Sequence, residues 1–240
     1  LFHCTTNLVF CRQEKNQVCF LFPVNLPNMN LLLISSQPVT TLFGKTFPFA
    51  DINCRVVAEP AVSDLDNTDC VIDLSFEEHP ERINLYQTSS IPVLIGSVVS
   101  RLNDLGVVES LPIARFNHWP VFINRNCIEF AAHPSQRELF EQLFIKLQVP
   151  FFATADTSGF ASARTLSMII NESFLAMEEQ ISTEAEIDTA MKLGTGYPMG
   201  PFEWCHAIGQ QRILALLQKL AATDQRYQPA ESLSQSNIFY

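Results

Sequence analysis

The sequence has little basic charge, no long apolar run and no closely spaced pair of cysteines. Its 240 residues include 15 Lys and Arg against 25 Asp and Glu, for a formal net charge of −10. A surface that binds nucleic acid usually carries a basic patch, so this balance argues against a nucleic-acid partner. The longest apolar stretches, 18–22 and 31–34, are too short to span a membrane, and we expect no membrane association.

The seven cysteines are odd in number and scattered, with no C-x-x-C pair. This usage favours reduced thiols and a cytoplasmic location. A zinc site built from His3, Cys4, Cys11 and Cys19 is conceivable, but cysteine spacings of seven and eight residues match no ordinary structural zinc pattern. We therefore expect no metal.

Residues 1–28 follow neither a helical nor a strand period. They contain no basic start and no small-residue cleavage site, so we expect no secretory signal. Met29 directly precedes a credible first strand. Our hypothesis is that the folded unit starts at Met29 and that the first 28 residues are an extension or a misplaced start.

Residues 29–155 predict an α/β domain with a parallel sheet, because short β-branched apolar runs are typical of buried parallel strands. Only about forty residues separate Met29 from Cys70, which is little for two helical crossovers, so we expect a truncated Rossmann-like parallel sheet. Ser135 is the expected N-cap of a helix that continues to Leu147. The expected strands cover residues 30–36, 54–58, 69–75, 91–95, 112–123 in part, 127–131 and 150–155.

Residues 156–240 predict an all-helical domain. Apolar residues between Leu166 and Met177 recur at steps of three and four, which gives a helix with one apolar stripe. Thr183 and Glu186 form a capping-box pattern, so a second helix is expected there, closing at Gly194. Further helices are expected from about Phe202 and over 211–222.

Residues 186–203 read E-I-D-T-A-M-K-L-G-T-G-Y-P-M-G-P-F-E, with D-T-S-G-F at 156–160 and Asn171-Glu172 upstream. This long run resembles the C-terminal domain of the 3-hydroxyacyl-CoA dehydrogenases of fatty-acid oxidation. The resemblance implies a Rossmann-like sheet domain followed by an all-helical dimerisation domain that closes over a shared cleft. It also implies NAD as cofactor, acyl-CoA as ligand and a homodimer.

The family's phosphate-binding turn is missing. The resemblance implies a G-x-G-x-x-G turn after the first strand, where glycines let the backbone approach a pyrophosphate. Residues 35–44 instead read S-S-Q-P-V-T-T-L-F-G, and Pro38 lacks a backbone N–H. We therefore predict no tight NAD binding.

The resemblance also implies a catalytic histidine–glutamate dyad and a nearby serine, for which His118, Glu129 and Ser100 are the candidate relics. Aligning the family on Pro120 puts the catalytic histidine on Phe116, and aligning it on Glu129 puts the histidine on Asn117. His118 is thus near the position rather than on it. The alternative for His118 is an ordinary loop histidine, and for Glu129 an ordinary strand-edge carboxylate.

Two functions follow from these patterns. Ala163 stands where the family has a substrate-contacting asparagine, and a methyl group cannot hydrogen-bond a substrate. With the phosphate turn and the histidine also displaced, we favour a homologue that has lost catalysis and acts as a dimeric binding or scaffold protein. The alternative is an active NAD-dependent 3-hydroxyacyl-CoA dehydrogenase.

Overall fold

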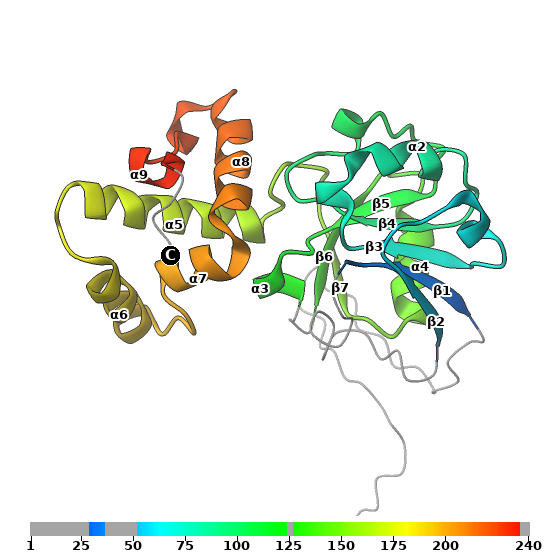
Figure 1. Cartoon of the computed structure of the whole chain (residues 1–240), viewed down its shortest axis with the longest axis horizontal. Coiled ribbons are helices and arrows are strands. Elements are labelled where there is room, and N and C mark those ends of the chain that lie inside the picture. The colour runs from blue at the N-terminus through cyan, green and yellow to red at the C-terminus, as the bar shows by residue number, and fades with distance from the viewer. Residues whose placement is uncertain (1–28, 37–51, 124–126, 236–240) are drawn as a thin grey trace, which may run out of the picture.

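The computed structural model describes residues 29–36, 52–123 and 127–235. These residues form a sheet half and a helical half that lie side by side (Figure 1). The chain passes from one half to the other between β7 (Phe151–Ala153) and α5 (Ser162–Glu178). The zinc candidates before Met29 and most of the loop that follows the first strand lie outside the described residues.

The described residues of the first half build one sheet in the order β2-β1-β3-β4-β5-β6-β7. All neighbouring strands run parallel except β5 and β6, which pair antiparallel. The Rossmann-like parallel sheet is therefore confirmed. The strands are β1 (Asn30–Ile34), β2 (Asn53–Val57), β3 (Cys70–Asp73), β4 (Val93–Gly96), β5 (Ile113–Phe116), β6 (Ile128–Ala132) and β7 (Phe151–Ala153).

The two faces of the sheet are covered separately, as the period of two along a strand requires. Leu31 and Leu33 of β1 point to one face, where they join a core that includes Phe140 and Phe144 of α4 (Arg137–Lys146). The alternate residue Leu32 points to the other face and packs in a core that includes Tyr86. Burial on both faces explains why these strands are apolar throughout.

The shortening that the sequence predicts lies in the connections, because the sheet itself has seven strands. Between β2 and β3 the helical structure is limited to a 3₁₀ turn, Val62–Leu65. Between β3 and β4 it is two 3₁₀ turns, Phe76–Glu78 and Pro80–Arg82, and the single-turn helix α2 (Ile83–Tyr86). Another 3₁₀ turn, Asn103–Leu105, follows β4, and the short helix α3 (Pro120–Ile123) follows β5.

The prediction that Ser135 caps α4 is wrong. The helix begins at Arg137 after Gln136, which provides no side-chain cap. The Ser135 hydroxyl instead donates a 2.7 Å hydrogen bond to the carbonyl of Glu109. A nearby loop carbonyl therefore uses the hydroxyl that the sequence pattern assigned to the helix.

The second half is all-helical, as predicted. Its longest helix, α5, carries the expected apolar stripe, and Leu166, Ile170 and Phe174 are buried in the core of this half. A 3₁₀ turn at Gln225–Tyr227 precedes the last helix. The helices after α5 are α6 (Glu184–Thr195), α7 (Pro201–Ile208), α8 (Gln210–Ala221) and α9 (Glu231–Ser234).

The capping box at the start of α6 is confirmed. The Thr183 hydroxyl accepts from the backbone N–H of Glu186, and the Glu186 carboxylate accepts from the backbone N–H of Thr183. The predicted end is wrong, because Gly194 lies inside the helix and α6 runs to Thr195. Gly196, with φ of 72°, is the residue that adopts the left-handed conformation after it.

The two halves share packing. The core of the helical half also contains Trp119, Phe122 and Val98, which come from the loops and the short helix at the end of the sheet. Ion pairs between Glu78 and Arg212 and between Asp104 and Lys219 join the sheet half to α8.

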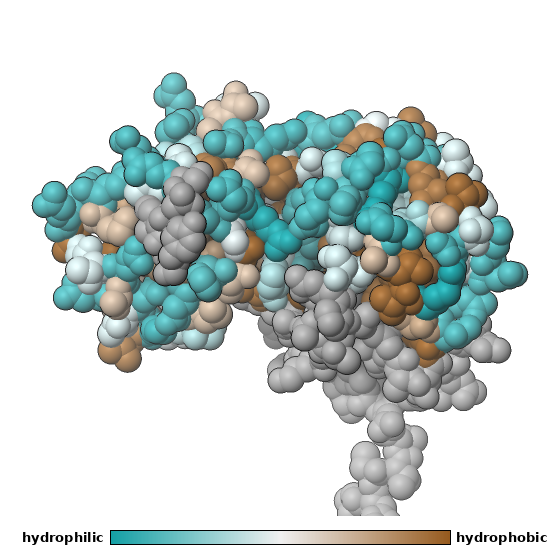
Figure 2. Space-filling model, viewed as in Figure 1, coloured by the Kyte–Doolittle hydropathy of each residue, from teal (hydrophilic) through white to brown (hydrophobic). Residues whose placement is uncertain are grey.

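The face of the helical half drawn in Figure 2 is mostly hydrophilic, with a small hydrophobic group at its lower tip, where α6 lies. On this helix Leu193 is 83% exposed, and Ile181, in the loop before it, is 69% exposed. Within the described residues, no helix combines the length and the apolar character that crossing a bilayer requires.

Candidate ligand site between the two halves

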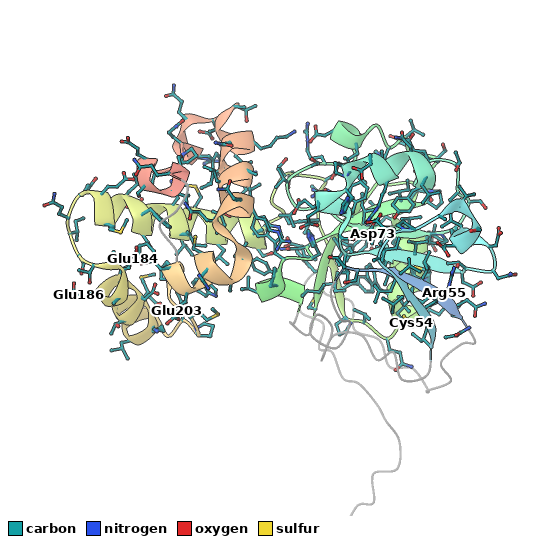
Figure 3. The ribbon with its side chains drawn as sticks, in the orientation of Figure 1. Cys54, Arg55, Asp73, Glu184, Glu186 and Glu203 are labelled. Atoms are coloured by element: carbon teal, nitrogen blue, oxygen red, sulfur yellow. The ribbon has the colours of Figure 1, made fainter. Side chains whose placement is uncertain are left out.

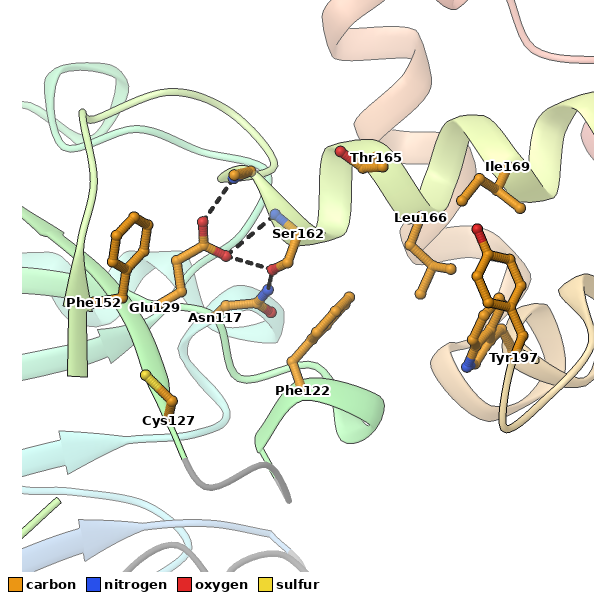
Figure 4. Close-up of a pocket in the computed structure, with 12 residues that line it drawn as sticks. Asn117, Phe122, Cys127, Glu129, Phe152, Ser162, Thr165, Leu166, Ile169 and Tyr197 are labelled. Atoms are coloured by element: carbon orange, nitrogen blue, oxygen red, sulfur yellow. Dashed lines mark hydrogen bonds between the residues drawn. The ribbon is translucent and has the colours of Figure 1, made fainter. Parts of the chain in front are cut away.

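A cavity of about 520 Å³ lies between the end of the sheet and helix α5 (Figure 4). Its lining comes from both halves and is mostly apolar, with polar groups gathered at one end. Cavities of this size and character are typical of small-molecule sites. The lining residues are Asn117, Phe122, Cys127, Glu129, Phe152, Ala161, Ser162, Thr165, Leu166, Ile169, Tyr197 and Trp204.

The polar end is a three-residue network. The Ser162 hydroxyl donates to the carboxylate of Glu129 and accepts a 2.9 Å hydrogen bond from the side-chain amide of Asn117. Glu129 also accepts from the backbone N–H groups of Ala161 at 2.7 Å and of Ser162 at 3.3 Å. These bonds are drawn in Figure 4. The carboxylate therefore caps the first turn of α5, where a negative charge is favoured by the helix dipole.

The antiparallel pairing of β5 and β6 brings Asn117 and Glu129 together. Phe116 pairs with Phe130, and directly beyond that pair the backbone N–H of Asn117 donates to the carbonyl of Glu129 at 2.9 Å. Successive residues of an extended chain point to opposite sides, so Asn117 faces the cavity and His118 does not. Asn117 is 2% exposed, and its side-chain amide nitrogen is a donor that cannot act as a base.

The other end of the cavity is aromatic and aliphatic. Tyr197, from the turn between α6 and α7, lies with its ring centroid 5.1 Å from that of Trp204 on α7. Leu166 and Ile169 of α5 and Phe122 of α3 complete this end (Figure 4). An apolar chain would be desolvated there, while a carbonyl or hydroxyl group would meet Asn117 and Ser162.

His118 is buried in the β5–α3 loop and does not line the cavity. Its ring packs against Gly96 of β4, where an added Cβ would stand 2.7 Å from the imidazole Cγ. Burial lowers the pKa of His118, an effect that the nearby Glu77 opposes. Neither ring nitrogen has a hydrogen-bond partner among the residues that the structure describes, and Nε2 lies 3.8 Å from the Glu77 carboxylate. Among the described residues, Glu129 and Asn117 thus meet in the cavity, and His118 stands apart from both.

Glu77 holds the loop after β4, a role that the sequence patterns did not suggest. Its carboxylate accepts 2.7 Å hydrogen bonds from the backbone N–H groups of Val98 and Val99, and a 3.0 Å bond from the indole N–H of Trp119. Ser100 follows in this loop, where its carbonyl accepts from the hydroxyl of Ser97. Ser100 does not line the cavity.

Ser162 was not predicted as a site residue. Ala163, which stands at the family's asparagine position, is fully buried in the core of the helical half and does not line the cavity. One signal for the polar end was available, because aligning the family on Glu129 already puts the catalytic position on Asn117. Ser162 carries no such signal, since only the fold brings α5 next to β6.

A Rossmann-like fold takes a dinucleotide at one edge of its sheet. Such a ligand lies at the carboxyl ends of the strands and needs converging N–H donors for its pyrophosphate. At the carboxyl ends of β2 and β3 the guanidinium of Arg82 bonds to Ala58, Glu59, Asp73 and Ser75. Figure 3 marks Asp73 among the side chains of the sheet interior. The described residues of this edge do not fit a dinucleotide.

Metal chemistry finds no support in the described ranges, where no group of three or more His, Cys, Asp and Glu could hold an ion. Among the described cysteines, Cys54, Cys70 and Cys205 are free thiols. Burial raises the pKa of the Cys205 thiol to about 12, so this group stays protonated at neutral pH.

Three comparisons bear on the family. Residues 159–237 match the model of the 3-hydroxyacyl-CoA dehydrogenase C-terminal domain. The 3-hydroxyadipyl-CoA dehydrogenase of Escherichia coli is 45% identical over 83 residues, which are 34% of this chain and only 18% of that protein. The 3-hydroxybutyryl-CoA dehydrogenase of Bradyrhizobium diazoefficiens is 26% identical over 86% of this chain and 74% of its own length.

Among solved structures, the (S)-3-hydroxybutyryl-CoA dehydrogenase of Ralstonia eutropha superposes with a TM-score of 0.63 at 22% identity. The match covers 78% of this chain and 69% of that structure. At this identity the likeness establishes the fold: a Rossmann-like sheet followed by a helical domain.

Proposed function

We propose that this protein binds acyl-CoA thioesters between its two halves, because residues 159–237 match the 3-hydroxyacyl-CoA dehydrogenase C-terminal domain and follow a Rossmann-like sheet. The observation that carries the proposal is the cavity with one polar and one apolar end. Its polar end supplies the Asn117 amide and the Ser162 hydroxyl to a thioester or 3-oxygen group. Its apolar end accepts the acyl chain.

Two activities are compatible with such binding. The comparisons favour the first, oxidation of a 3-hydroxyacyl-CoA, because the relatives named above are all dehydrogenases. A specific feature of the site favours the second, binding without oxidation. In a dehydrogenase site a base has to take the hydroxyl proton. Here Asn117 occupies the place beside Glu129, and its amide cannot accept that proton.

Binding is tested by calorimetric titration with acetoacetyl-CoA. We expect saturable binding to the wild-type chain. Thr165 is exposed and lines the cavity, so Thr165→Trp should fill the cavity and weaken binding at least about tenfold. Glu172 is exposed on the same helix and does not line the cavity, so Glu172→Trp is the matched control and should leave binding unchanged. Equal affinities for both variants would refute the cavity as the site.

The two activities separate in one assay of the wild-type chain with 3-hydroxybutyryl-CoA and NAD, followed by the absorbance of the reduced nicotinamide. Binding without oxidation predicts no absorbance change with a thioester that binds in the titration. Turnover would establish the dehydrogenase. His118→Ala then tells whether the buried histidine takes part, since a residue outside the cavity should leave turnover unchanged.

We also propose a homodimer, in line with the family resemblance, and keep the division into domains at residues 155 and 156 and a cytoplasmic location as proposals. The apolar stripe of α5 is buried within one chain, so it offers no surface for self-association. Among the described residues of the helical half, the large apolar side chains that are exposed are Leu193 and Ile181, near α6. Sedimentation of the wild-type chain beside Leu193→Lys tests this contact, and identical monomeric profiles would refute it.

A further inference from the structure

At the carboxyl edge of the sheet, the side chain of Arg82 links the two strands that flank β1. One terminal nitrogen, Nη2, donates to the carbonyl of Ala58 at 3.2 Å and to the carboxylate of Glu59 at 3.0 Å, just beyond β2. The other, Nη1, donates to Ser75 at 2.8 Å and to Asp73 at 3.4 Å, at the end of β3.

The position of the guanidinium follows from the sheet order. β1 lies between β2 and β3, with Ile34 in register with both Val57 and Asp73. Neighbouring strands are about 4.8 Å apart, so β2 and β3 are separated by about 10 Å with β1 between them. A group bonded to both outer strands therefore lies across the carboxyl end of β1.

That end of β1 is the switch point of this sheet, because the chain runs from β1 to β2 on one side and then crosses from β2 to β3 on the other side. Open α/β sheets bind their ligands in the crevice at such a point. Arg82 is 7% exposed, and both of its terminal nitrogens are engaged by protein acceptors. They are not directed outward at an anion.

Asp73 fixes Arg82 in this place. Asp73 is fully buried, and its carboxylate accepts from the Tyr86 hydroxyl at 2.7 Å, from the backbone N–H and hydroxyl of Ser75, and from Arg82. A buried carboxylate requires a partner of opposite charge. Moving Arg82 away to admit a ligand would leave that charge unpaired.

We propose that Arg82 is an internal plug of the nucleotide crevice: it joins β2 to β3 across β1 and occupies the space in which a dinucleotide would lie. The sheet keeps its Rossmann-like order, and at the switch point the guanidinium of Arg82 joins the ends of β2 and β3. Arg82 lies at the carboxyl ends of β2 and β3, whereas the thioester cavity lies beyond β5 and is lined by other residues, so either proposal can fail without the other.

The test uses the wild-type chain and two probes, NADH followed by its fluorescence and ADP followed by calorimetry. The plug predicts no saturable binding of either probe up to about 1 mM. Saturable binding of either one below that concentration would overturn it. Acetoacetyl-CoA titrated into the same sample reports on the proposed function and has no bearing on the plug.

Thermal unfolding of two variants supplies a second readout. Arg82→Gln removes the charge opposite Asp73, so the melting temperature should fall by on the order of 10 °C. The control is Arg55→Gln, which breaks an ion pair with Asp64 in which Arg55 is 49% exposed, and a shift of about 2 °C or less is expected. Equal melting temperatures for the two variants would show that Arg82 does not hold the strands together and would overturn the proposal.

Discussion

Gly200 lies directly against Asp188: a Cβ built on residue 200 would stand 2.3 Å from the carboxylate Oδ1. The close approach exists because Asp188 of α6 caps the next helix, accepting from the backbone N–H groups of Phe202 at 2.8 Å and Glu203 at 3.2 Å. The pair therefore fixes the angle at which α7 leaves the turn, and with it the position of Trp204 in the cavity wall.

Replacing Gly200 with alanine should destabilise the protein by about 1–3 kcal/mol, because the new methyl group overlaps the Asp188 side chain. Gly194→Ala is the matched control. Residue 194 lies inside α6 with open space around it, so alanine there should add about 0.5–1 kcal/mol of stability. Urea unfolding measures both, and a loss at Gly194 equal to that at Gly200 would contradict the contact.

Glu129→Gln should lower the free energy of unfolding by about 1 kcal/mol, since the charge that caps α5 is lost while the side-chain shape is kept. The same change at Glu172, exposed in the middle of that helix, should have little effect. Denaturant unfolding distinguishes the two. If both variants matched the wild type, Glu129 would not be acting as a cap.

Arg115→Met should cost about 3–5 kcal/mol, because it leaves Asp156 and several carbonyl groups without their partner. The buried guanidinium pairs with Asp156, donates to the carbonyls of Ser97 and Thr157, and lies 4.0 Å from the ring centroid of Phe160. The exposed pair of Arg137 with Glu141 is the comparison, and Arg137→Met should cost less than about 1 kcal/mol. Similar losses for the two variants would refute the assignment.

Asp104 should contribute to acid sensitivity. Its hydrogen bond with Arg101, aided by Lys219 of α8, holds the pKa of the carboxyl well below its usual range. The unfolded chain then binds the proton first, so this contribution is present above about pH 4 and is lost as the pH falls toward the folded pKa.

In Asp104→Asn the loss of stability between about pH 4 and pH 2 should accordingly be smaller than in the wild type. Arg101→Gln removes the largest cause of the lowered Asp104 pKa, so it should also make the loss of stability in acid smaller than in the wild type. Urea unfolding across the acid range gives these slopes, and parallel profiles for all three proteins would argue against the effect.

Much of the fold could be predicted from the sequence, because its signals are local. β1 and β3 are short, mostly apolar runs, and the start of α6 is a two-residue capping box. The antiparallel reversal at β6 and the end of α6 at Thr195 were not predicted. Gly194, inside the helix, and Gly196, two residues later, are equally good candidates in the sequence for the end of α6. Only the structure shows that Gly196 takes that position.

The candidate site depends on which of two neighbouring residues faces the cavity. The alternation of side chains along a strand decides this only when the position of the strand is known. Asn117 and His118 point to opposite sides of β5's extension, so a shift by one residue would exchange their roles. The family resemblance leaves the choice between alignments open. The hydrogen bond from Asn117 to Glu129 fixes the register in the structure. Contacts such as Glu77 with Trp119, 42 residues apart, have no local signal at all.

Trp119 belongs to the sheet half by sequence and to the helical half by packing, and it is fully buried. A cut between Ala153 and Ser162 would leave Trp119 and Phe122 on one fragment and the side chains they pack against on the other. Recombination that exchanged the helical half alone would separate these partners as well. A fragment that keeps the core of the helical half intact therefore has to include the β5–α3 segment, so it is larger than the helical half itself.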